Sequence, residues 1–98
     1  MIRLALPSHL SRMAGVEREV QLQIEGIPNM QAVLDALEAE YPMLQGTLRD
    51  HLTRQRRAYI RFFALGEDIS QDPLDRPLPS AIADGSQPLR VVGAMSGG

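Results

Sequence analysis

Few residues in this chain of 98 residues could do chemistry by themselves. Cysteine is absent, which excludes disulfides, thiolate metal ligands and a cysteine nucleophile. His9 and His51 each lack a second histidine or a carboxylate at ligand spacing, so we expect no bound metal. The sequence contains neither a P-loop nor a glycine-rich dinucleotide fingerprint. We therefore expect a protein that is not an enzyme on its own and binds no cofactor.

The most distinctive feature is the pair Gly97 and Gly98, which follows an apolar strand pattern at 89–92. Glycine averages about 7% of residues, so a terminal pair is uncommon. Frayed tails and expression scars also end in small residues. The meaning of the pair therefore depends on the elements that precede it.

Length and composition indicate one domain, which we place at 1–93, with a flexible tail at 94–98. The apolar stretches are far shorter than the ~20 residues of a membrane span. The start of the sequence lacks a signal-peptide pattern, so we expect a cytoplasmic protein with no membrane contact. The net charge of −2 argues against nucleic-acid binding. All ten basic residues are arginine, which leaves the N-terminus as the one amine.

Alternating apolar residues predict strands at 2–6 and 19–25, which together suggest a hairpin. The period then changes to that of a helix, with apolar residues at positions 30, 33, 34, 37 and 41. Asn29 is a suitable N-cap, and Pro42 cannot continue the helix without cost. A short helical turn is expected within 43–52.

A third strand is predicted at 57–65, with the turn-like stretch 66–70 after it. The proline-punctuated segment 71–79 is expected to be loop with a very short edge strand, and 81–88 to be a turn region. The last strand follows at 89–92. This order favours an α+β class protein of the β-grasp (ubiquitin-like) fold, a mixed sheet of four to five strands around one main helix. A small ferredoxin-like domain with a missing element would give a similar order.

Six short stretches, taken together in this order, resemble the MoaD/ThiS family of ubiquitin-like sulfur carriers, which includes the small subunit of molybdopterin synthase. They are "HLSRMAG", "EREVQLQIEG", "AVLDALEAEYPML", "GEDIS", "LPSAIADG" and the terminal "GG". The stretch 56–70 also resembles the carrier branch that serves cysteine biosynthesis. The tail "GAMSGG" lacks the proline of many members, and "AL" replaces the common "VN" before Gly66. These departures leave the acceptor enzyme open.

The resemblance implies that the α-carboxylate of Gly98 is the functional group. In the family, an E1-like adenylyltransferase activates it with Mg-ATP, and sulfur then replaces the adenylate to give a thiocarboxylate. The implied acceptors are the large subunit of molybdopterin synthase, thiazole synthase or cysteine synthase. Glycine at 97 and 98 would let the tail enter a narrow cleft, since it has no side chain and few backbone restrictions.

Strand alternation also predicts a face for partner proteins, on the side of the sheet away from the helix. Aromatic residues and arginine are frequent at interface hot spots. The predicted partner-binding residues are Arg3, Tyr59, Arg61, Phe63, Arg90 and Val92, together with Ala94, Met95 and Ser96 of the tail. A solvated sheet face with scattered apolar residues is the competing interpretation.

Two other functions remain open from the sequence. The same fold could serve as a modifier joined to lysines of other proteins, or as a binding-only module with an inert tail. A second basic cluster, Arg54, Arg56 and Arg57, is expected to be a solvated loop rather than a phosphate or RNA contact.

Overall fold

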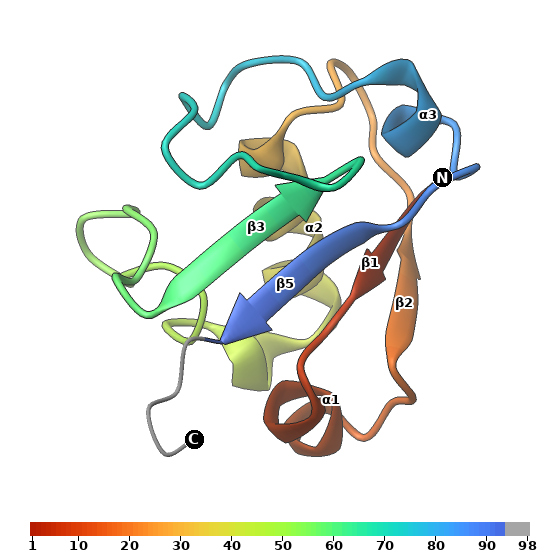
Figure 1. Cartoon of the computed structure of the whole chain (residues 1–98). Coiled ribbons are helices and arrows are strands. Elements are labelled where there is room, and N and C mark those ends of the chain that lie inside the picture. Colours follow the sequence, from red (N-terminus) through yellow and green to blue (C-terminus); the bar gives the residue numbers. More distant parts are fainter. Residues whose placement is uncertain (94–98) are drawn as a thin grey trace.

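The computed structural model describes residues 1–93 and shows a five-stranded mixed sheet with one long helix against it (Figure 1). The strands are β1 (Ile2–Ala5), β2 (Glu19–Leu22), β3 (Ile60–Ala64), β4 (Glu67–Asp68) and β5 (Leu89–Gly93). The helices are α1 (Ser8–Ala14), α2 (Met30–Glu40), the 3₁₀ turn η1 (Pro42–Leu44) and α3 (Ser80–Ala83). This is the predicted β-grasp fold, of the α+β class.

The strand order across the sheet is β2-β1-β5-β3-β4. β5 lies parallel to β1 and antiparallel to β3, and both outer pairs are antiparallel. The sheet is therefore mixed, as predicted. β1 and β2 pair antiparallel as expected, although the helix α1 lies between them instead of a simple hairpin turn.

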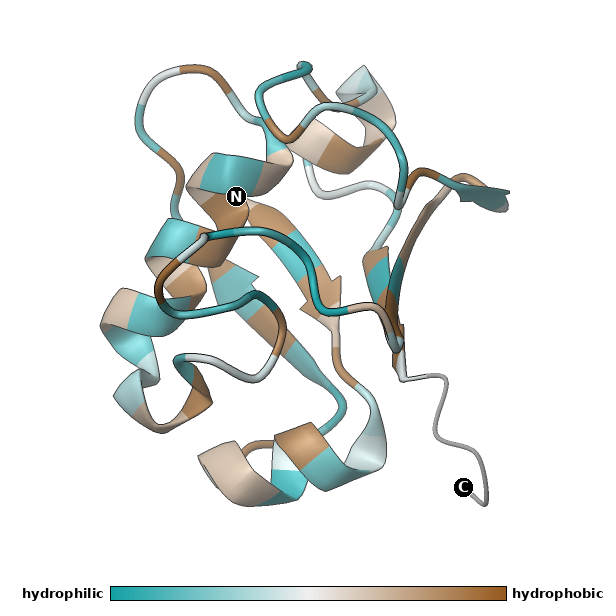
Figure 2. Cartoon of the chain, turned by 90° about the vertical axis from the view of Figure 1, so that its left-hand side faces the viewer, coloured by the Kyte–Doolittle hydropathy of each residue, from teal (hydrophilic) through white to brown (hydrophobic). Residues whose placement is uncertain are grey.

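Strand and helix each bury one apolar side. Alternate residues of β1 and β3 are buried, as period two requires when one face of the sheet is covered. Helix α2 buries Met30, Val33, Leu34 and Leu37 of the predicted stripe, and position 41 follows the end of the helix. Figure 2 shows the helical layer beside the sheet, with hydrophobic and hydrophilic residues alternating along each element.

The predicted limits of α2 are correct. The side-chain Oδ1 of Asn29 accepts a hydrogen bond of 2.8 Å from the amide of Ala32, which satisfies one amide of the first turn. The helix ends at Glu40, and Pro42 begins the 3₁₀ turn η1. The helical turn expected within 43–52 is this element, displaced toward its start.

Three local predictions were wrong. The connection after β1 contains the helix α1, which ends at Gly15 with φ of 70°. The edge strand is not in 71–79; it is β4, formed by residues expected to be a turn, and 71–79 contributes one isolated bridge between Pro77 and Asn29. The expected turn region after Pro79 begins with the helix α3. All three are short elements whose formation depends on tertiary contacts rather than on a periodic pattern.

Candidate functional site

Strand β5 is the element that comes directly before the predicted tail. It lies between β1 and β3, and its last residue, Gly93, is opposite Ile60 at the start of β3. The predicted tail residues Ala94, Met95 and Ser96, and the predicted reactive glycines Gly97 and Gly98, lie outside the described residues. The described geometry therefore fixes the point from which the tail departs.

The side of the sheet away from α2 carries the predicted partner-binding residues of the body. Arg61 is opposite Val92, and Phe63 is opposite Arg90, on the neighbouring strands β3 and β5. Val92 and Tyr59, which precedes β3, remain 42% and 44% exposed. These residues bring apolar and cationic groups together along β5 and β3.

Arg3 lies on the same face, on the neighbouring strand β1, and its guanidinium is hydrogen-bonded to other residues of the protein. Its guanidinium donates two hydrogen bonds, of 3.0 and 3.1 Å, to the carboxylate of Glu19 on β2. A third, of 3.1 Å, reaches the carbonyl oxygen of Gly85. The hydrogen bond from Arg3 holds the pKa of Glu19 below its ordinary value, with the positive charges of Arg3 and Arg90 acting in the same direction. Sequence reasoning did not identify Glu19 as a partner of Arg3.

Arg61 faces a carboxylate at the other edge of the sheet. Its Nη1 atom lies 3.6 Å from Oδ2 of Asp68 on β4. Hydrogen bonds from the Ser70 side chain and backbone amide lower the pKa of Asp68, and the charges of Arg61 and Arg56 lower it further. Asp68 therefore stays ionised beside the face.

Arg90 differs from both of these arginines, because it has no ion pair within residues 1–93. The register places it in a row that crosses the whole sheet in the order Glu19, Ala5, Arg90, Phe63 and Asp68. Carboxylates thus stand at both edges and an unpaired cation stands in the middle. Such a row suits a partner that presents an acidic group over β5.

The second basic cluster is less solvated than predicted. Arg56 donates to the carbonyl oxygens of Ser70, Arg57 and Ile60, and Arg57 donates to the carbonyl of Gly46. The expectation of a solvated loop is therefore wrong for these two residues, which satisfy backbone carbonyls. Arg54 alone is half-exposed, and its guanidinium pairs with Asp35 at 3.2 Å.

A buried arginine in the same loop escaped sequence reasoning. Arg49 is 2% exposed, and its guanidinium binds Glu38 through two hydrogen bonds and Asp35 through one. This cluster ties the loop after η1 to the outer side of α2. The sequence signal for this cluster is the spacing of Asp35 and Glu38, which lie on one face of a helix. The same spacing is common on solvated helices, so it does not indicate a buried ion pair.

Within residues 1–93, no group of three or more His, Cys, Asp or Glu side chains could hold a metal ion. None of the helices described there is long and apolar enough to cross a membrane.

The comparisons with known proteins agree on the fold. Small archaeal modifier protein 1 from Haloferax volcanii has a TM-score of 0.75 and 23% identity, with 99% of this chain and 98% of that chain covered. A chain of the BexX/CysO complex from Amycolatopsis orientalis has a TM-score of 0.75 and 17% identity, with both chains fully covered. CysO from Mycobacterium tuberculosis has a TM-score of 0.74 and 20% identity, covering 97% of this chain and 100% of that one.

These likenesses define a ubiquitin-like β-grasp protein. No family model matches the sequence. A cytoplasmic dynein heavy chain from Paramecium tetraurelia is 37% identical over 57 residues, which are 57% of this chain and 1% of that protein. Because the match covers about 1% of the dynein heavy chain, it gives no information on whether this protein shares the activity of dynein.

Proposed function

We propose that this protein is a ubiquitin-like sulfur carrier whose reactive group is the α-carboxylate of Gly98. The observation that carries the proposal is the position of β5. This central strand of a β-grasp sheet ends at Gly93, beside an exposed face of aromatic and cationic residues, and the sequence then runs through small residues to Gly97 and Gly98. A partner that binds the face would thus lie next to the departing tail.

The tail is long enough for an active site in a partner. The five residues 94–98 span at most about 17 Å when extended. Four of them are glycine, alanine or serine, and the fifth is the unbranched Met95. Because glycine carries no side chain, the last two positions can pass a narrow channel with few backbone restrictions.

The proposed chemistry requires an activating partner, since an ionised carboxylate is a poor electrophile. A carboxylate oxygen of Gly98 attacks the α-phosphorus of Mg-ATP in an E1-like adenylyltransferase, which forms an acyl-adenylate and releases pyrophosphate. A hydrosulfide ion then attacks the acyl carbon and displaces AMP. Where the donor is a protein persulfide, its terminal sulfur attacks instead and gives an acyl disulfide. A thiol then cleaves the S–S bond of this acyl disulfide and forms a disulfide with the donor. The product is a thiocarboxylate at Gly98. This chain supplies no sulfur of its own for the step, because it has no cysteine.

The thiocarboxylate would pass its sulfur to an acceptor enzyme and be returned to a carboxylate by water. The acceptor classes implied by the sequence resemblance are the large subunit of molybdopterin synthase, thiazole synthase and cysteine synthase. One fold neighbour belongs to a complex of BexX and CysO, which fits a protein that works in contact with a partner.

A second function has one observation in its favour. A fold neighbour bears the name small archaeal modifier protein 1, and a modifier would use the same activated carboxylate to acylate an amine on another protein. The absence of lysine from this chain excludes lysine-linked chains of the protein on itself.

Removal of Gly98 tests the proposal with little risk to the fold. The body is held by the sheet and α2, so the shortened chain should unfold at the same temperature as the full chain. Activation should be lost, measured as ATP–pyrophosphate exchange with the cognate adenylyltransferase. Exchange that persists without Gly98 would contradict the assigned reactive group.

A further inference from the structure

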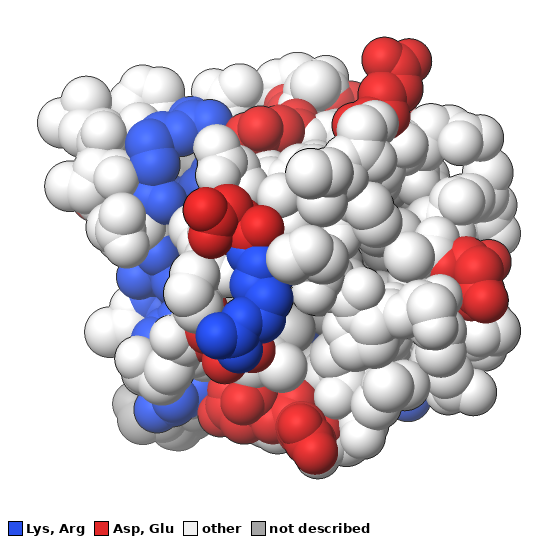
Figure 3. Space-filling view, turned by 90° about the horizontal axis from the view of Figure 1, so that it is seen from above, with Lys and Arg blue, Asp and Glu red and all other residues white. Residues whose placement is uncertain are grey.

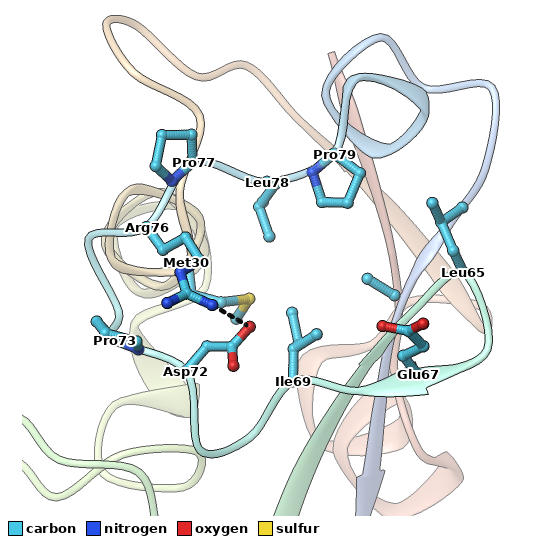
Figure 4. Close-up of a pocket in the computed structure, with 11 residues that line it drawn as sticks. Met30, Leu65, Glu67, Ile69, Asp72, Pro73, Arg76, Pro77, Leu78 and Pro79 are labelled. Carbon is cyan, nitrogen blue, oxygen red and sulfur yellow. Dashed lines mark ion pairs between the residues drawn. The ribbon is translucent and has the colours of Figure 1, made fainter.

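A groove of about 320 Å³ opens at the end of the sheet remote from Gly93. Its floor is apolar, with Met30 from α2, Ile69 after β4, and Leu78 of the proline-rich segment (Figure 4). Pro73, Pro77 and Pro79 line one side, and the turn between β3 and β4 lines the other. None of the functions considered so far uses this groove.

Backbone hydrogen bonds fix the segments that line the groove. The amide of Ile69 donates to the carbonyl of Phe62 at 2.8 Å, and the amide of Leu78 donates to the carbonyl of Pro28 at 2.8 Å. On the floor, Met30 is 4% exposed and Leu78 is 9% exposed. A ligand would therefore meet a formed surface and would not have to order a loop on binding.

Leu65 stands at the rim in a conformation that leucine avoids. Leu65 and Gly66 are the central residues of the two-residue turn between β3 and β4, and both have positive φ, 54° and 83°. This turn type favours Asn or Asp followed by Gly. The Leu65 side chain is nevertheless 53% exposed to solvent. Leucine is unfavourable at this turn position, and the exposed side chain of Leu65 adds nothing to the core. Leu65 therefore stabilises neither the turn nor the core, which points to a role in contact with another molecule.

The charge around the groove is acidic. The stretch 67–76 contains the carboxylates of Glu67, Asp68, Asp72 and Asp75 against the single cation of Arg76. Arg76 is paired with Asp72 at 3.5 Å, whereas Glu67 has no ion pair within residues 1–93. Figure 3 views this end of the molecule and shows acidic side chains spread over it, with a basic group between acidic ones near the centre and most other basic side chains on the left.

We propose that this groove is a docking site for a segment of a partner protein that presents an apolar side chain next to an arginine or lysine. The apolar side chain packs on Ile69 and Leu78 beside Leu65, and the cation lies against Glu67. Because the groove is at the opposite end of β3 from Gly93, a partner can hold it while the tail is engaged elsewhere. The proposal does not rest on the chemistry of Gly98.

The test uses the full chain, labelled with ¹⁵N, and the probe N-acetyl-Leu-Arg-amide. Amide signals of Leu65, Glu67, Ile69 and Arg76 should shift with a dissociation constant of about 1–10 mM, a range expected for a small fragment. N-acetyl-Leu-Glu-amide and N-acetyl-Ala-Arg-amide should each bind at least about threefold more weakly. Glu67→Gln should remove the preference for arginine over glutamate. Equal binding of the three probes, or shifts centred on Tyr59, Phe63 and Val92, would overturn the proposal.

The variant Leu65→Asn separates docking from folding. Asparagine suits positive φ, so the variant should unfold about 4 °C higher than the natural chain. It should also bind N-acetyl-Leu-Arg-amide at least about threefold more weakly. The matched control is Leu52→Asn in the loop after η1, where the natural leucine is 85% exposed and outside the groove. Unchanged binding by Leu65→Asn would contradict the site, as would concentration-dependent self-association of the natural chain that Leu65→Asn abolishes.

Discussion

The guanidinium of Arg49 and the carboxylate of Glu38 form a bidentate ion pair that is almost fully withdrawn from water. Nε of Arg49 lies 2.9 Å from Oε2 of Glu38, and Nη2 lies 3.0 Å from Oε1. Their side chains are 2% and 9% exposed. The pair fixes the loop that leads from α2 to β3, and β3 carries Arg61 and Phe63 of the predicted partner face.

Replacing Arg49 by methionine should destabilise the protein by about 3 kcal/mol, because it leaves the buried carboxylate of Glu38 without its main partner. Urea unfolding followed by circular dichroism measures the change. The double variant Arg49→Met with Glu38→Leu is the control and should recover much of the loss, since two apolar groups replace the pair. A loss below about 1 kcal/mol in the single variant would contradict the assigned role.

Gly85→Ala should be more costly than Gly26→Ala, although both glycines have nearly the same φ, +84° and +83°. Each alanine is strained by about 1–2 kcal/mol in this region. A Cβ at Gly85 would also lie 2.7 Å from the carbonyl oxygen of Met1, whereas a Cβ at Gly26 meets nothing within 4 Å. We expect the Gly85 variant to lose at least about 1 kcal/mol more than the Gly26 variant in the same urea experiment. Equal losses would mean that the start of β1 moves away freely.

Arg3 should control the titration of Glu19. The folded pKa of Glu19 is lowered by its bonds to Arg3, so it lies below the unfolded value of about 4.3. The pair therefore contributes stability above that pH, and the contribution is lost as the pH falls through the folded pKa. Carboxyl carbon NMR should show the lowered midpoint, and Arg3→Gln should raise it toward 4.3. A midpoint that does not move in Arg3→Gln would contradict the pair.

Charge reversal of Arg90 should weaken binding to the adenylating partner by about tenfold or more, because this cation has no ion pair within the described residues and lies on the predicted partner face, opposite Phe63. Isothermal calorimetry or surface plasmon resonance measures the affinity. Arg12→Glu on α1 makes the same change of charge at an exposed position outside the sheet, and it should bind like the natural chain. Equal weakening by both variants would show that binding depends on the net charge of the protein alone, and it would contradict the assignment of this face to the partner.

The sequence was sufficient for the elements with strong periodicity and for their arrangement. The stripe of α2, its N-cap at Asn29 and the alternation of β1, β2 and β5 all appear in the structure as predicted. These patterns are local and repeat over several residues, so each residue supports the same interpretation. The inward and outward sides of the sheet followed from them.

Short elements and polar contacts could not be predicted in the same way. Strand β4 has two residues and forms because it pairs with β3 across the Leu65–Gly66 turn. A strand of two residues is too short to show a periodic pattern in the sequence. The contact of Arg3 with Glu19 depends on the register of β1 against β2, and that of Arg49 with Glu38 on the path of a loop. Such pairings appear only when the chain is folded.

The most direct test of the proposed function is intact-mass spectrometry of the full chain after coexpression with its adenylyltransferase and a sulfur donor. A sulfur carrier should show a species in which one sulfur replaces one oxygen, located at Gly98 by fragmentation and absent when the adenylyltransferase is inactivated. Protein-sized adducts with no such species would indicate a modifier instead. An unchanged mass with an active adenylyltransferase would contradict the carrier outright.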